Sequence, residues 1–174
     1  MLHADGYMLS DYITFPVTEP AAVHARNGVA YNPAKGGDFM AAVQTHLPPS
    51  MSVIRLKGMD SSEIKDVLSH AQVYVDAGHH PGKDRIPREA AALGCIVLVS
   101  QKGSGNDNND VPLPSSHKFR LVDGPKAVAR RIIECDEDPT AMLAGQDVYR
   151  GAIREEKSIL RREVRRIFGE GGPL

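Results

Sequence analysis

The segment from Asp76 to Glu89 carries the densest group of chemically active side chains in the sequence. Its glycines and first basic side chains are Gly78, His79, His80, Gly82, Lys83 and Arg85. Glycines let backbone amides approach a ligand closely, and cationic side chains beside the start of a helix attract negative charge. The segment therefore predicts a site for an anionic, phosphate-bearing ligand.

A purely structural interpretation of this segment is also open. In it, the two glycines form turns and Asp84 caps the helix that follows. Arg85, Arg88 and Glu89 then make a solvated face, in which each ion pair contributes less than about 1 kcal/mol.

A second candidate loop runs from Asn32 to Gly37 and contains the triplet Lys35, Gly36 and Gly37. Paired glycines allow backbone N–H groups to approach a phosphate, and the lysine supplies a point charge. A turn from a strand into a helix also favours glycine, so this motif by itself does not decide between ligand binding and chain geometry.

Several kinds of chemistry lack their motifs. The adjacent histidines at 79 and 80 point apart in an ordinary backbone, and we find no third ligand at metal-binding spacing, so no metal is expected. The sequence has no nucleophile elbow, no GxxxxGK[ST] phosphate loop and no GxGxxG fingerprint. Nucleotide or sugar-phosphate binding remains, with no cofactor expected and no catalytic residue assigned.

Apolar runs alternate with helical patterns along the chain, which predicts the elements that position these loops. Strands are expected at residues 27–33, 52–56, 72–76, 95–99 and 118–122. Helices are expected at 38–46, 59–69, 84–93, 126–134 and 147–168. Near-continuous β-branched strands separated by helices indicate an α/β fold, a three-layer Rossmann-like parallel sheet that is doubly wound. Ligands gather at the carboxyl ends of such strands, where both candidate loops lie.

Length and composition limit the organisation of the protein. The 174 residues suit one domain, which we divide into an entry segment at 1–26, the nucleotide-binding domain at 27–146 and a helix with its tail at 147–174.

A net charge of -1 gives no long-range field, so nucleic acid is not an expected partner. Cys95 and Cys135 form no CxxC pair and are expected to be reduced core thiols. The sequence shows no membrane span or signal peptide, which favours the cytoplasm.

Two further segments have recognisable patterns. The Gly, Ser, Asn and Asp residues between 101 and 109 predict an exposed, mobile loop. In the last helix, Tyr149, Ile153, Leu160, Val164 and Ile167 form an apolar stripe opposite a basic face. That face consists of Arg150, Arg154, Lys157, Arg161, Arg162, Arg165 and Arg166. The stripe must pack on the chain's own sheet, on a second copy or on a separately encoded domain, and we expect self-association; glutamates dilute the basic face and disfavour nucleic acid or membrane.

The sequence resembles the C-terminal, donor nucleotide-sugar binding domain of bacterial GT-B glycosyltransferases, group 1 or family 4-like. The resemblance rests on residues 29–36, 76–95 and 110–114, with GxHPGKDRIPREA as its most specific part. It implies that Glu89 holds the ribose hydroxyls of the donor. It also implies that Lys35, together with Lys83 or Arg85, meets the diphosphate.

Two departures from the family pattern bear on activity. A complete GT-B enzyme has a second domain that binds the acceptor, whereas this chain has room for about one domain. The family's E-x7-E motif is incomplete, because Pro81 stands eight residues before Glu89. The expected function is therefore a donor-binding domain that works with a second domain or chain, and the alternative is a non-catalytic module that binds a nucleotide or a related phosphate metabolite.

Overall fold

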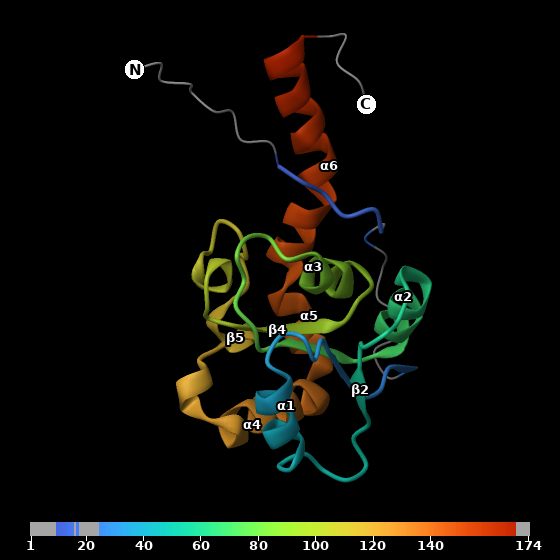
Figure 1. Cartoon of the computed structure of the whole chain (residues 1–174), viewed down its shortest axis with the longest axis vertical. Helices are drawn as coiled ribbons and strands as arrows, with labels where there is room; N and C mark the ends of the chain where they lie inside the picture. Colours follow the sequence, from blue (N-terminus) through green and yellow to red (C-terminus); the bar gives the residue numbers. More distant parts are fainter. Residues whose placement is uncertain (1–9, 16, 18–24, 170–174) are drawn as a thin grey trace.

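The computed structural model describes residues 10–15, 17 and 25–169, and its centre is a five-stranded sheet in the order β2-β1-β3-β4-β5 (Figure 1). The strands are β1 (Val29–Tyr31), β2 (Val53–Arg55), β3 (Val73–Asp76), β4 (Ile96–Ser100) and β5 (Lys118–Phe119). All neighbouring strands are parallel. The predicted doubly wound α/β fold is confirmed. Most of the predicted entry segment, residues 1–26, lies outside the described residues.

Helices cover both faces of the sheet and give the predicted three layers (Figure 1). They are α1 (Gly37–Gln44), α2 (Ser61–His70), α3 (Arg85–Ala92), α4 (Pro125–Glu137), α5 (Pro139–Gly145) and α6 (Asp147–Phe168). In Figure 1, α1 and α4 lie below the sheet, whereas α2 and α3 lie above it and α6 rises upward from it. The predicted last strand is too long: it ends at Phe119, and Leu121–Asp123 forms a 3-10 turn that leaves Val122 exposed.

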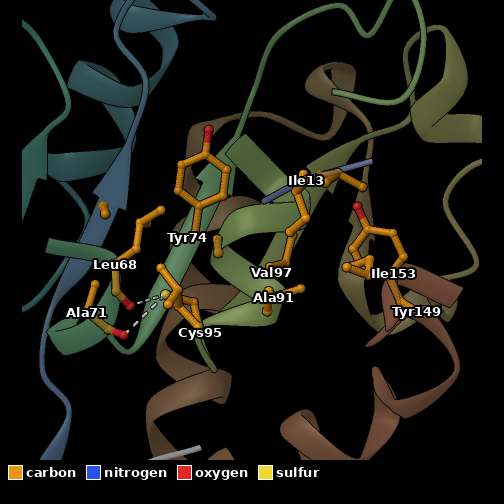
Figure 2. Close-up of a cluster of buried hydrophobic side chains, with 14 of the residues drawn as sticks. Ile13, Leu68, Ala71, Tyr74, Ala91, Cys95, Val97, Tyr149 and Ile153 are labelled. Carbon is orange, nitrogen blue, oxygen red and sulfur yellow. Dashed lines mark hydrogen bonds between the residues drawn. The ribbon is translucent and has the colours of Figure 1, made fainter. Parts of the chain in front are cut away.

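The sheet is buried on both faces because its strands are apolar at successive positions. Ala30, Tyr74 and Val97 belong to the core under α3, and their sequence neighbours belong to the core that faces α1 and α4. Figure 2 shows the α3 side, where the Cys95 thiol donates to the Leu68 carbonyl at 3.0 Å. Burial raises the pKa of Cys95 to about 12. Both cysteines are free and buried, as the sequence predicted.

Helix α6 is held on α3 by a buried ion pair. Arg88 Nη1 lies 2.9 Å from Glu156 Oε2, and Arg88 Nη2 lies 2.8 Å from Asp11 Oδ2 on the entry segment. Arg88 and Glu156 are 2% and 5% exposed, and Glu89 is buried beside them. The interpretation of Arg88 and Glu89 as a solvated face is therefore wrong, because the face of α3 that carries them packs against other elements.

The amphipathic pattern of α6 is only partly realised within the chain. Tyr149, Ile153 and Val164 of the predicted stripe are buried, whereas Leu160 and Ile167 are half-buried. Arg150 was expected on the basic face but is buried near the start of the helix. The C-terminal half of α6 extends past the sheet (Figure 1), where the Ser10 amide donates to Glu163 Oε2 at 2.7 Å. Among the described residues, no helix combines the length and the apolar character that a membrane crossing needs.

Backbone hydrogen bonds hold part of the polar loop at 101–109, which its composition alone did not predict. The Ser104 amide donates to the His80 carbonyl at 2.9 Å, and the His80 amide donates to the Lys102 carbonyl at 3.3 Å. Gly105 is buried in the same turn. Backbone pairing thus joins the first part of this loop to the segment that follows β3.

Candidate functional site

A pocket of about 230 Å³ lies at the topological switch point of the sheet. The chain passes from β1 to β2 on one side and from β3 to β4 on the other, so the loops after β1 and β3 diverge and leave a crevice. The lining residues of this switch-point pocket are Asn32, Lys35, Asp76, Asp84, Arg85, Ile86 and Pro87. The structure therefore brings Lys35 of the first candidate loop together with Arg85 of the second.

Both cations of the switch-point pocket have a carboxylate partner. Lys35 Nζ forms an ion pair with Asp84 Oδ2, and both side chains are partly exposed. The mostly exposed Arg85 has its Nε 3.6 Å from Glu89 Oε1. A phosphate entering the pocket would meet positive charge that is already partly neutralised, so binding requires these cations to exchange carboxylate for phosphate contacts.

Two helices begin beside this pocket without a side-chain cap. Gly36, at the N-cap of α1, adopts a left-handed conformation and has no side chain to offer. Asp84 occupies the N-cap position of α3 but makes no capping hydrogen bond, because its carboxylate turns toward Lys35 and His80. Asp84 thus occupies the expected N-cap position of α3, but the expectation that its side chain caps the helix is wrong. Amides at uncapped helix starts are suited to bind an anion.

The glycines divide into two groups according to what surrounds them. A Cβ on Gly36 would lie 2.9 Å from Ala77 Cβ, and one on Gly78 would lie 2.6 Å from Lys35 Cβ. These two glycines are needed for the close approach of the loops after β1 and β3. A Cβ on Gly82 would meet nothing within 4 Å, and one on Gly37 would make only ordinary contact with Pro33. Packing against other parts of the chain therefore does not explain why glycine stands at positions 82 and 37.

This difference predicts opposite effects on stability. Gly78→Ala is expected to lower the free energy of unfolding by about 1 to 3 kcal/mol, because the added methyl overlaps the aliphatic part of Lys35. Gly82→Ala is expected to change it by less than about 0.5 kcal/mol, since the space is open. Urea denaturation of both variants measures the difference, and equal losses would contradict the packing argument.

The remaining predicted site residues are not all in the switch-point pocket. His79 is exposed, whereas His80 is buried. Gly82 and Lys83 line a different pocket of about 460 Å³, formed with Ser10, Asp11, Pro81, Asp110 and Glu163. Of the two residues suggested as the second diphosphate charge, Arg85 therefore shares a pocket with Lys35 and Lys83 does not.

Glu89 lies one helical turn into α3, behind Arg85. Its side chain is buried, and this burial raises the pKa of its carboxyl group, while Arg85 and Arg88 act in the opposite direction. Arg85 connects it to the rim of the switch-point pocket. A ribose contact would require the Arg85 side chain to move from its position beside Glu89.

The sequence prediction missed one cluster. Asp76, His80 and Asp84 each place a ligand-type atom within 4.8 Å of the other two. The premise that no carboxylate stands at ligand spacing from a histidine is therefore wrong, because the loop after β3 folds back and brings together residues four positions apart. The spacing D-x3-H-x3-D in the sequence is the signal that could have found this cluster.

Comparison with solved structures gives the same architecture. The chain superposes on the catalytic domain of cholesterol-alpha-glucosyltransferase from Helicobacter pylori with a TM-score of 0.58 and 13% sequence identity. The match covers 72% of this chain and 96% of that one. The chain has the fold of a GT-B glycosyltransferase domain. At this identity the likeness concerns the fold alone, and no protein-family model and no curated protein sequence matches the chain.

Proposed function

We propose that this GT-B-type domain binds the nucleotide-diphosphate sugar donor of a glycosyl transfer reaction. The observation that carries the proposal is the position of Lys35 and Arg85 in one pocket at the switch point, between the uncapped starts of α1 and α3. Dipoles and cations that converge there favour a diphosphate. The GT-B fold supports a glycosyl donor over other phosphate ligands.

In this proposal the diphosphate takes Lys35 from Asp84, and the amides at the starts of α1 and α3 donate to its oxygens. Positive charge fixed at that point would also stabilise the nucleoside diphosphate as it leaves the sugar. Glu89 accepts from the ribose hydroxyls once Arg85 turns to the phosphate. The acceptor is bound by a second domain or chain, because the residues of this chain make up about one domain and its pocket is given to the donor.

A panel experiment tests the proposal directly. Calorimetry with UDP, GDP, ADP and their sugars should show binding of at least one donor, and a product assay should then detect hydrolysis or transfer. Absence of binding across the panel would overturn the proposal. Binding without turnover would favour the alternative, a stand-alone nucleotide-binding module, which is supported by Pro81 standing exposed where the family pattern has an acid.

The Glu89 assignment predicts a selective loss of affinity. Glu89→Gln should weaken a nucleoside diphosphate about 10- to 100-fold, in line with the roughly 1.5 to 3 kcal/mol of a charged hydrogen bond, and leave inorganic pyrophosphate unchanged. The ionised carboxylate offers one acceptor oxygen to each hydroxyl, whereas the amide or the protonated acid has a single carbonyl oxygen for both. Burial raises the pKa of Glu89 above the ordinary value for glutamate, which is about 4.3. As the pH is lowered, wild-type affinity should therefore begin to fall while the pH is still above that value, and the variant should not show this pH dependence.

Calorimetry over a pH series measures both effects. Equal losses for pyrophosphate and the nucleotide would contradict a ribose contact. The raised pKa of Glu89 also affects stability. It favours folding at a pH below the pKa of this carboxyl group in the unfolded chain, and this contribution is lost as the pH rises through its pKa in the folded protein.

Self-association through α6 is a further part of the proposal. Leu160 and Ile167 are half-buried and Phe168 is exposed on the part of the helix that extends past the sheet. A second copy could cover these side chains. Light scattering should show a mass that rises with concentration, and Phe168→Ser should reduce it; a strict monomer over a wide concentration range would exclude this contact.

A further inference from the structure

The imidazole of His80 lies between two carboxylates at the carboxyl end of β3. His80 Nδ1 is 2.6 Å from Asp84 Oδ2, and His80 Nε2 is 3.7 Å from Asp76 Oδ1. The short contact requires that Nδ1 carries a proton and donates it to Asp84. In the neutral ring, Nε2 then presents a lone pair toward the Asp76 oxygen, and two acceptors face each other.

His80 is 2% exposed, and within the described part of the chain its Nε2 has no hydrogen-bond partner. A buried polar atom without a partner costs roughly 1 to 3 kcal/mol, so such an atom calls for an explanation. The distance of 3.7 Å is too long for a direct hydrogen bond to Asp76. Nε2 is therefore directed at a carboxylate that it does not reach.

The local charges point to a missing positive group. Asp84 has Lys35 as its cationic partner. Asp76 is 1% exposed and accepts from the Tyr74 hydroxyl at 3.3 Å and the Gly78 amide at 3.0 Å. Within the described part of the chain, the basic group in ion-pair range of Asp76 is the His80 ring, because Lys35, which lines the same pocket, pairs with Asp84. An ionised carboxylate in such a place is stabilised by a cation.

We propose that a divalent transition-metal cation of the zinc type binds between the Asp76 carboxylate and His80 Nε2. Two ligands about 2.0 to 2.1 Å from a tetrahedral zinc ion stand about 3.4 Å apart, so the observed 3.7 Å needs a shift of only a few tenths of an ångström. A carboxylate with an imidazole nitrogen suits this class of metal.

Asp84 has the position of the group that orients a metal-binding histidine. In such sites the second ring N–H donates to a carboxylate, which fixes the tautomer and makes the other nitrogen a better ligand. Asp76 and Asp84 both line the switch-point pocket, so water or a phosphate oxygen from the pocket can complete the coordination. The site is built from this chain alone, so the cation should bind without a nucleotide, whether or not the donor proposal holds.

The test is a zinc titration of the full chain, stripped with a chelator, by calorimetry without nucleotide. One equivalent should bind. Asp76→Asn and His80→Gln should each lower the affinity at least tenfold, whereas His79→Gln, the exposed neighbour, should leave it unchanged. Zinc binding that is equal in wild type and both site variants would overturn the proposal, as would binding lost in His79→Gln.

A spectroscopic measurement covers the case in which a site variant does not fold. Equimolar cobalt(II) added to the stripped wild-type chain should give the visible absorption bands of a four-coordinate ion with nitrogen and oxygen ligands, and zinc should displace it. Wild-type protein that binds neither zinc nor cobalt would overturn the metal site.

Discussion

Glu156→Ala is expected to lower the free energy of unfolding by about 3 to 5 kcal/mol. The substitution removes the buried partner of Arg88, whose guanidinium is 2% exposed and cannot regain full hydration in the folded state. A buried charge left without its partner costs far more than the pair contributes when it is intact. Urea denaturation, followed by circular dichroism, measures the loss as a lower midpoint at an unchanged slope.

Two controls separate this effect from a general weakening of α6. Glu155→Ala changes the adjacent glutamate, which is exposed, and should alter stability by less than about 0.5 kcal/mol. Asp11→Asn removes the other Arg88 partner, whose side chain is 67% exposed, and should cost less than about 1 kcal/mol. Similar losses in all three variants would show that burial of Arg88 does not control the stability of the α3–α6 contact.

Lys35→Ala should weaken the nucleoside diphosphate that binds best in the panel by about 10- to 100-fold. The estimate follows from the roughly 1.5 to 3 kcal/mol of a hydrogen bond to a charged group. The variant also leaves Asp84 in the switch-point pocket without its cation, and an unneutralised carboxylate repels phosphate. Calorimetry at two salt concentrations should show the loss, with a weaker salt dependence in the variant.

Lys57→Ala is the matched control, because Lys57 lines the neighbouring pocket beside β2 together with Asn32 and Leu56. Its removal should change affinity less than about twofold. If Lys57→Ala were the more damaging substitution, the diphosphate would lie in that neighbouring pocket and the role assigned to Lys35 would be wrong. Asp84→Asn adds a second check, since it frees Lys35 and should not reduce diphosphate affinity.

The fold was largely predictable because its signals are local. Apolar β-branched runs predicted β1 to β4, and Asp60 forms a capping box with Glu63 at the start of α2. Gly94 ends α3 with a positive φ of 91°. The last strand was overextended because Leu121 and Val122 are apolar, yet no neighbouring strand extends far enough to pair with them.

The candidate site was predicted less completely because side-chain contacts depend on tertiary structure. Charge and glycine content located both loops, and the topology then brought Lys35 and Arg85 together. Composition could not show that Arg88 faces Glu156, which is 68 residues away. Nor could it show that a loop folds back to bring Asp76 and Asp84 to either side of one histidine.

The position of Arg88 on α3 has a consequence for how the switch-point pocket receives a ligand. Helix α3 begins at the pocket and, one turn later, is fixed to α6 and to the entry segment by the Arg88 ion pairs. Tilting its first turn away from the pocket would separate a buried pair. The amides at that turn are therefore preorganised, and a ligand binds there without first having to order the backbone, which lowers the entropic cost of association.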